Sequence, residues 1–245
     1  MYQLIFLDIE SHKGRPWKAL TMQLKQAFVN HHYKPEEDVY GVDNWNQFFT
    51  SKPEDDKQLE LFIHLKNVER QYNMKAGLIP EFGRVICVSL GIQGADEQLR
   101  TICYKGTNEV EILTKLATLL NKFGDKEYGI CGWNTNGFDI PFLAKRYIVN
   151  GMHCPILLNP IGMKPWERLD KDLMQIWKCS GWQSVSLEVA CSCLNLPVKF
   201  TEHTGKDLWE LELSEMDWDM LEMYCNNDMY SCFLIYKYLD EIGFL

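Results

Sequence analysis

The run QLIFLDI at residues 3–9 constrains the fold most, because it is apolar without alternation. A strand buried on both faces has this pattern, whereas a strand with one wet face alternates apolar and polar residues. Residues 84–92, RVICVSLGI, repeat the pattern. We therefore expect a sheet covered by helices on both faces, and 46% hydrophobic residues supply the core that such a sheet needs.

The remaining elements follow in an order typical of a mixed α/β sheet. Further strands are predicted at residues 98–104, paired with 84–92 across a turn, and at residues 128–133. Apolar residues at helical spacing predict a helix over residues 109–123, and further helices are expected at 138–149, 184–194 and 216–238. Pro141 confines the regular part of the second helix to the residues that follow it.

One stretch between the first two strands interrupts this order. Residues 33–75 are polar, and we expect surface helices there without a core of their own. The chain is thus predicted to be a single domain over residues 1–245 with an insertion at about 33–75. Residues 195–210 are predicted to be a loop with Pro, Gly and polar side chains.

Charge and composition exclude several classes of protein. The 25 Lys and Arg residues against 34 Asp and Glu leave a net charge of −9, which argues against a broad basic face that coats nucleic acid. The apolar runs are far shorter than the ~20 residues of a membrane span. The start, MYQLIFLDIE, lacks the basic region of a signal peptide. Nine cysteines form no CxxC pair, which indicates free thiols and a cytoplasmic location.

Two carboxylates end the first predicted strand. Asp8 and Glu10 are two residues apart, so an extended chain projects them to one face, where they repel each other. A divalent cation would relieve this repulsion, since hard cations prefer oxygen ligands. Two solvated acids at a strand end are the alternative, and the D-x-E pattern alone does not decide between them.

Two further patterns place acids on helices. In the segment NTNGFD, which follows the strand at 128–133, Asp139 lies near a helix start as either an N-cap, which contributes ~1 kcal/mol, or a metal ligand. In YCNND, Tyr224 and Asp228 are four residues apart and share one helical face. An amphipathic helix with a surface Asp is the alternative.

The three patterns occur in the order D-x-E, N-x-x-x-F-D, Y-x-x-x-D. In this order and on these elements, they resemble the DEDD superfamily of 3′→5′ exonucleases, which has a ribonuclease H-like fold. The resemblance spans residues 3–240. The flanking segments GWNTNGFDIPFL, DLMQIWK and YCNNDMYSCFLIYKYL are similar to the exonuclease domains of family B DNA polymerases and to stand-alone bacterial exonucleases related to them.

The resemblance implies a metal-dependent enzyme that releases nucleoside 5′-monophosphates from the 3′ end of single-stranded DNA. It assigns two divalent ions, Mg²⁺ or Mn²⁺, to four carboxylates: Asp8, Glu10, Asp139 and Asp228. Met223 stands where one branch of the superfamily has its catalytic His, so Tyr224 places the chain in the Tyr branch. A tyrosine hydroxyl is a poor base at neutral pH, so we expect Tyr224 to orient the attacking water.

Substrate contacts are predicted at Ser11, Asn134, Phe138 and Lys206. Ser11 is adjacent to the first motif, with capping as its alternative role. Stacking of a base on Phe138 would be worth ~1–3 kcal/mol, with core packing as the alternative. Lys206 lies in the 195–210 loop, where a solvated loop is the alternative. Asp172 resembles a family acid outside the metal set.

Two other functions compete with this interpretation. An RNA exonuclease of the ribonuclease D type has similar motifs, although no helical module of the kind found there follows residue 240, which favours DNA. The second competing function is that of a catalytically silent ribonuclease H-like module, which binds nucleic acid or protein. Silent relatives usually lose one of the carboxylates, and all four are present in this chain.

Overall fold

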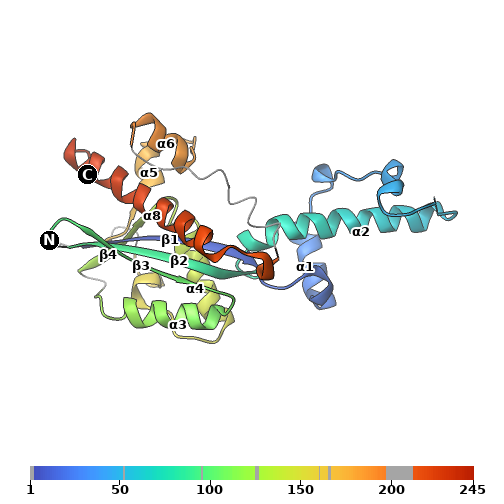
Figure 1. Ribbon diagram of the computed structural model, residues 1–245, viewed down its shortest axis with the longest axis horizontal. Coiled ribbons are helices and arrows are strands. Elements are labelled where there is room, and N and C mark those ends of the chain that lie inside the picture. The colour runs from blue at the N-terminus through green and yellow to red at the C-terminus, as the bar shows by residue number, and fades with distance from the viewer. Residues whose placement is uncertain are drawn as a thin grey trace.

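The computed structural model describes residues 3–51, 53–94, 96–124, 127–159, 161–164, 167–196 and 212–245. Its centre is a five-stranded sheet in the order β3-β2-β1-β4-β5 (Figure 1). The middle strand β1 (Gln3–Lys13) runs antiparallel to β2 (Gly83–Gln93) and parallel to β4 (Tyr128–Gly132). β3 (Leu99–Lys105) pairs antiparallel with β2, and the short β5 (Lys171–Asp172) pairs parallel with β4.

Helices cover both faces of the sheet, as the continuous apolar runs predict. One face packs against α5 (Leu173–Lys178), α6 (Leu187–Cys193) and α8 (Trp218–Glu241), and η7 (Leu213–Glu215) precedes α8. The other face packs against α3 (Glu109–Leu120), α4 (Asp139–Val149) and η5 (Ile156–Leu158). Along β1, Leu4 and Phe6 belong to the core under α8, whereas Ile5, Leu7 and Ile9 belong to the opposite core.

The predicted strands and helices are confirmed, with changes at their ends. β1 continues four residues past the predicted limit, because β2 pairs with it as far as Lys13. α4 begins at Asp139, and Pro141 stands in its first turn, where a helix needs no backbone donor. β5, α5 and α1 (Met22–His31) are additions that the apolar pattern did not predict.

An arm formed by residues 14–82 separates β1 from β2 and projects from one end of the sheet (Figure 1). It contains α1 and the longer α2 (Asp56–Lys75), together with four short 3-10 helices: η1 (Trp17–Ala19), η2 (Pro35–Glu37), η3 (Val42–Gln47) and η4 (Ala76–Leu78). Buried amides tie its loop to α2, since Asn67 Oδ1 accepts from the backbone N–H groups of Val39 and Tyr40.

The arm has a small core, so the prediction that residues 33–75 build none was wrong. Val68 and Tyr72 of α2 pack against Phe28 of α1 and against Phe82, next to Leu20 and Ala76. Most of these partners lie before residue 33 or after residue 75, outside the polar stretch itself. In the described part of the chain, no helix is both long and apolar enough to cross a membrane.

Candidate active site

Asp8 and Glu10 continue the row of β1 side chains that faces α8. Residues two apart in a strand share a face, so the row that begins with Leu4 and Phe6 continues into the two acids. β4 pairs with β1 only as far as Phe6, which leaves this part of β1 open along one edge. A bulge follows Glu10, where the register with β2 shifts. Both carboxylates are half-buried beside the open edge.

Asp139 reaches this edge from the opposite helical layer. It is the first residue of α4 and is buried, at 4% exposure. Its Oδ1 atom accepts a hydrogen bond of 3.2 Å from the backbone N–H of Ile9, between the two acids of β1. Phe138 occupies the N-cap position and no side chain caps the helix, so the N-cap alternative for Asp139 is wrong. The carboxylate instead joins β1 across 130 residues of sequence.

Asp228 joins the group from α8, together with Tyr224 one turn before it. The Tyr224 hydroxyl donates a hydrogen bond to the Asp228 carboxylate, as the four-residue spacing allows. Asp228 interacts electrostatically with Asp8, Glu10 and Asp139. Met223 points elsewhere, with 50% of its surface exposed. The structure therefore brings together all four predicted carboxylates and Tyr224.

The four carboxylates repel one another electrostatically, and their pKa values are raised. Burial, and then neighbouring thiol and acidic groups, raise the pKa of Asp8 well above its usual range, and burial and neighbouring acids do the same for the pKa of Glu10. Burial raises the pKa of Asp139 to about 7 and that of Asp228 to about 6. No ion pair among the described residues involves any of the four. Clustered acids with raised pKa values are typical of functional sites.

The donor set fits divalent metal ions. Asp8, Glu10 and Cys225 offer ligand atoms that all lie within 4.8 Å of one another, and Asp139 and Asp228 add carboxylate oxygens. Oxygen donors of this kind suit Mg²⁺ and Mn²⁺, whose positive charge would remove the repulsion between the acids. A structural role would leave that repulsion uncompensated.

Cys225 is a site residue that the sequence patterns missed. It is fully buried, and its Sγ atom lies 3.3 Å from Oδ2 of Asp8. In the sequence, Cys225 cannot be distinguished from the other buried cysteines, which occupy apolar core positions. Its spacing to Asp228 could have predicted this role, because residues three apart in a helix such as α8 share one face.

The predicted substrate-contact residues have different surroundings. The Ser11 hydroxyl is buried and donates to the carbonyl of Gly77 in the arm, at 2.7 Å, rather than facing the carboxylates. Asn134 adopts a left-handed conformation, with φ of 61°. Phe138 is half-buried and packs against Phe142, with ring centroids 5.4 Å apart. Lys206 lies outside the described residues.

Asp172 holds the turn that leads into Asp139. Its carboxylate accepts from the backbone N–H groups of Asn134 and Asn136, both at 3.1 Å, and it also caps α5. These bonds fix the loop between β4 and α4 and thereby the position of the Asp139 backbone. Asp172 is thus a positioning residue, separate from the four-carboxylate group.

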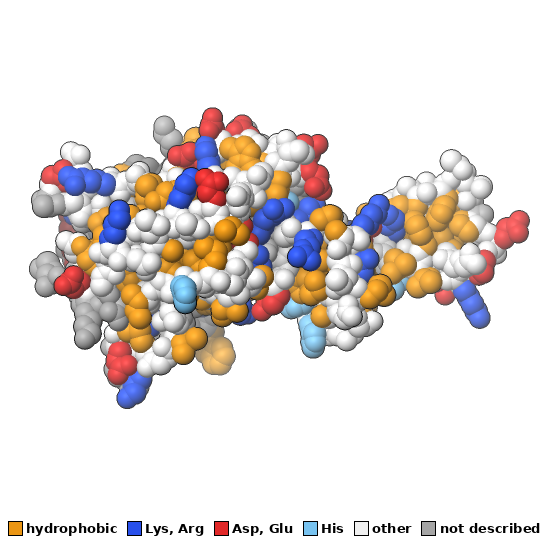
Figure 2. All heavy atoms as spheres, turned by 90° about the horizontal axis from the view of Figure 1, so that it is seen from below, with side chains coloured by type: hydrophobic (Ala, Val, Ile, Leu, Met, Phe, Trp, Pro, Cys, Tyr) orange, Lys and Arg blue, Asp and Glu red, His pale blue; other side chains and the backbone are white. Residues whose placement is uncertain are grey.

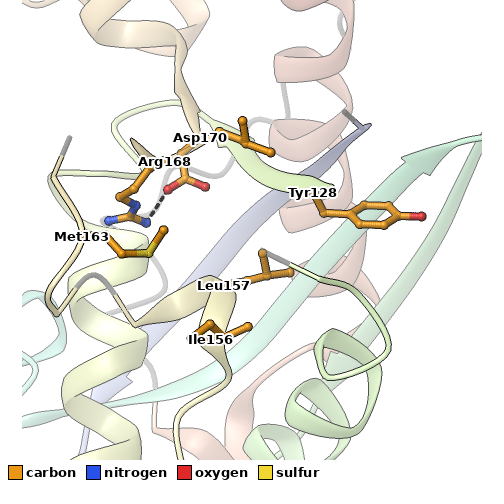
Figure 3. A pocket seen from close by; sticks show the side chains of 7 residues that line it. Tyr128, Ile156, Leu157, Met163, Arg168 and Asp170 are labelled. Carbon is orange, nitrogen blue, oxygen red and sulfur yellow. Dashed lines mark ion pairs between the residues drawn. The ribbon is translucent and has the colours of Figure 1, made fainter. Parts of the chain in front are cut away.

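A pocket beside Tyr128, at the start of β4, lacks a cluster of acids without cationic partners. Figure 3 shows it between Tyr128, η5, Met163 and residues 168–170, with mostly apolar side chains. Its charged residues, Arg168 and Asp170, form an ion pair with each other, and Asp170 also accepts from the Ile130 backbone N–H at 2.6 Å. The candidate site is therefore the carboxylate group near the carboxyl end of β4 and not this pocket.

Comparison with known proteins identifies the family. Residues 78–242, about two thirds of the chain, match the model of a family described as a predicted 3′-5′ exonuclease related to the exonuclease domain of PolB. The chain belongs to this family. The predicted enzyme class, a 3′-5′ exonuclease, is thereby confirmed. The match includes Asp139, Tyr224 and Asp228, whereas Asp8 and Glu10 precede it. No curated protein matches the sequence.

One solved structure supports the fold of a PolB-related exonuclease. A family B DNA polymerase from the hyperthermophilic archaeon Pyrobaculum calidifontis is 18% identical, with a TM-score of 0.53 over 69% of this chain and 23% of the polymerase. This likeness confirms the predicted ribonuclease H-like fold. E. coli Exonuclease I, solved with a dT13 oligonucleotide, is 12% identical, with a TM-score of 0.45 over 66% of this chain and 38% of that protein. The chain thus spans less than two thirds of either protein.

Proposed function

We propose that this PolB-related exonuclease hydrolyses single-stranded DNA from its 3′ end, using two divalent metal ions, and releases nucleoside 5′-monophosphates. The observation that carries the proposal is the convergence of Asp8, Glu10, Asp139 and Asp228 from one strand and two helices. The relation of the family to a DNA polymerase domain supports DNA over RNA as the substrate. All four acids are present, which argues against a silent nucleic-acid-binding module.

The four carboxylates would hold the metal ions. Bound Mg²⁺ or Mn²⁺ would lower the pKa of water and stabilise charge on the departing 3′ oxygen. The water would lose one proton as its oxygen forms a bond to phosphorus. The bond between phosphorus and the 3′ oxygen would break, and the 3′ oxygen would take up a proton. Asp139, held by the Ile9 N–H, is fixed relative to β1 before substrate arrives. This fixed geometry lowers the cost of organising the site during the reaction.

Tyr224 would orient the attacking water. Its hydroxyl donates to Asp228 and keeps lone pairs that can accept a hydrogen bond from water. The exposed Met223 in the adjacent position supports the assignment to the Tyr branch. Phe138 and Asn134 lie within five residues of Asp139 and are the proposed contacts to the terminal nucleotide. Ser11 would contribute its backbone, because its side chain is buried and its hydroxyl donates to the carbonyl of Gly77.

The test uses oligonucleotides labelled at either end. Wild-type protein with Mg²⁺ or Mn²⁺ should shorten 5′-labelled single-stranded DNA progressively and release the label of 3′-labelled DNA as a mononucleotide. EDTA and Asp139→Asn should each stop the reaction. Asp240→Asn, which removes an exposed acid at the end of α8, is the matched control and should keep full activity.

Four outcomes would contradict the proposal. Degradation from the 5′ end would exclude the reaction direction, and activity that persists in EDTA would exclude the metal mechanism. Faster degradation of RNA than of DNA would favour the ribonuclease D type of function. Binding of DNA without any hydrolysis by the wild type would support the silent module.

A further inference from the structure

The chain carries a basic segment directly after its first two acids. Residues 11–35 contain five Lys or Arg residues and no Asp or Glu, although the whole chain has a net charge of −9. The segment covers the end of β1, η1 and α1. It lies entirely before residue 78, where the match to the exonuclease family begins. Its charge is therefore a feature of the arm and not of the part that identifies the family.

Three of the five cations have no acidic partner among the described residues. Lys13 pairs with Glu212 at 3.0 Å, and Lys34 pairs with Glu37 at 3.4 Å. The others are Arg15, Lys18 and Lys25, and we call them the basic strip. Arg15 and Lys18 are exposed, and Lys25 is half-buried with its Nζ atom 5.5 Å from the centre of the Trp17 ring.

The arm core holds the basic strip in place. Trp17 packs against Tyr72 and Phe28, with ring centroids 5.3 and 6.0 Å away. The Tyr72 hydroxyl donates to the carbonyl of Arg15 at 2.7 Å, and the backbone N–H of Gly14 donates to the carbonyl of Phe82 at 2.7 Å. The backbone that carries the strip is thus fixed to the arm. Figure 2 shows Lys and Arg side chains gathered where the arm joins the sheet.

The strip begins close to the carboxylates. Arg15 is five residues from Glu10, so their Cα atoms are at most about 18 Å apart, and the first three of those steps belong to β1 itself. The buried Ser11 hydroxyl bond to Gly77 ties this part of β1 to the arm. A strand whose 3′ end lies at Asp8 and Glu10 can therefore reach the strip within a few nucleotides.

We propose that Arg15, Lys18 and Lys25 bind the phosphates of the substrate strand upstream of its 3′ end. The inference rests on the proposed function. Metal ions would neutralise the acids around the scissile phosphate, but the remaining phosphates would approach an acidic protein. Phosphate binding by Lys and Arg is the usual source of affinity for nucleic acid that does not depend on sequence. The strip supplies this affinity where the strand leaves the site.

The test compares two triple variants that remove the same charge. Arg15→Gln/Lys18→Gln/Lys25→Gln removes the strip, and Lys115→Gln/Lys122→Gln/Lys237→Gln removes three lysines from the α3 segment and the distal end of α8 (Figure 1). Fluorescence anisotropy in EDTA gives the Kd for a long oligothymidylate across a range of salt concentrations. Single-turnover hydrolysis with Mg²⁺ compares that oligothymidylate with a thymidine dinucleotide, which is too short to reach the strip.

Removal of the strip should weaken the salt dependence of binding. Each phosphate contact to a single strand contributes about 0.7 to the slope of log K against log salt, so the slope should fall by about 2 in magnitude. Between about 50 and 200 mM salt, the wild type should therefore lose about 20-fold more affinity than the strip variant. The strip variant should cleave the dinucleotide at the wild-type rate, and the control variant should resemble the wild type in both assays.

The outcomes separate this inference from the proposed function. A wild type that cleaves neither substrate would refute the proposed function. Cleavage with equal salt slopes for the wild type and the strip variant would refute the strip. An equal loss of activity on the long and the short substrate would show that the variant damages the site, which also contradicts the inference. If the triple variant fails to fold, Arg15→Gln/Lys18→Gln keeps Lys25 on Trp17, and its slope should fall by about 1.4.

Discussion

Asp139→Asn should stabilise the metal-free protein at about pH 8 and abolish its hydrolytic activity. The substitution keeps the shape of the side chain, and the Asn oxygen can accept the same hydrogen bond from the Ile9 N–H. It removes one negative charge from four acids that have no cationic partner among the described residues. The new amide N–H groups can donate to the neighbouring carboxylates, so no buried donor is left unpaired.

The expected magnitude follows from the pKa of Asp139. Burial raises this pKa from an ordinary value of 3.8 to about 7 in the folded protein. The protonated carboxyl is thus favoured by folding, so its stability contribution is complete below about pH 4 and is lost as the pH rises through about 7. The full shift corresponds to about 4 kcal/mol. Because neighbouring acids titrate together, we expect a gain of about 2 kcal/mol from the substitution, or about 4–8 °C in Tm.

The assay is thermal denaturation in EDTA at several pH values, followed by titration with Mg²⁺. Wild-type Tm should fall between about pH 4 and pH 7, and Asp139→Asn should flatten this decline. Mg²⁺ should raise the Tm of the wild type by binding the folded state and should have little effect on the variant. Asp240→Asn should behave as the wild type throughout. A variant that melts below the wild type at pH 8 would refute the reasoning, because Asp139 would then be a structural residue.

Three further predictions concern the same site. Tyr224→Phe should lower single-turnover kcat by ~10²–10⁴-fold with unchanged metal affinity, since only an orienting hydroxyl is lost, and a rate within twofold of the wild type would exclude that role. Ca²⁺ in place of Mg²⁺ should support DNA binding in anisotropy assays but not turnover, because its coordination is larger and looser; equal rates would count against two-metal catalysis. Cys225→Ser should keep Mg²⁺-dependent activity but weaken inhibition by thiophilic Cd²⁺ at least about tenfold, because the thiol beside Asp8 is a soft ligand. The exposed Cys179→Ser is its control, and equal inhibition of both variants would exclude the thiol as a Cd²⁺ ligand.

Local spacing was sufficient to predict the parts of the site that lie on one element. Asp8 and Glu10 share a face because a strand has a period of two, and Tyr224 meets Asp228 because a helix brings residues four apart together. The unbroken apolar runs predicted a central sheet covered on both faces, since each run must be buried on both sides. The resemblance to the exonuclease superfamily then indicated that the three motifs belong to one site.

Only the tertiary structure decided how the pieces meet. Asp139 reaches the Ile9 N–H because β4 ends at Gly132 while β1 continues to Lys13, and no local pattern encodes that difference in strand length. Cys225 lies in the site because its thiol contacts Asp8, which is far away in sequence. The Ser11 hydroxyl lies outside the site because it donates to the distant Gly77 carbonyl. The arm core likewise joins Phe28, Tyr72 and Phe82 across a polar stretch. Spacing along a chain determines which side chains share a face, whereas strand register and helix packing determine which faces meet.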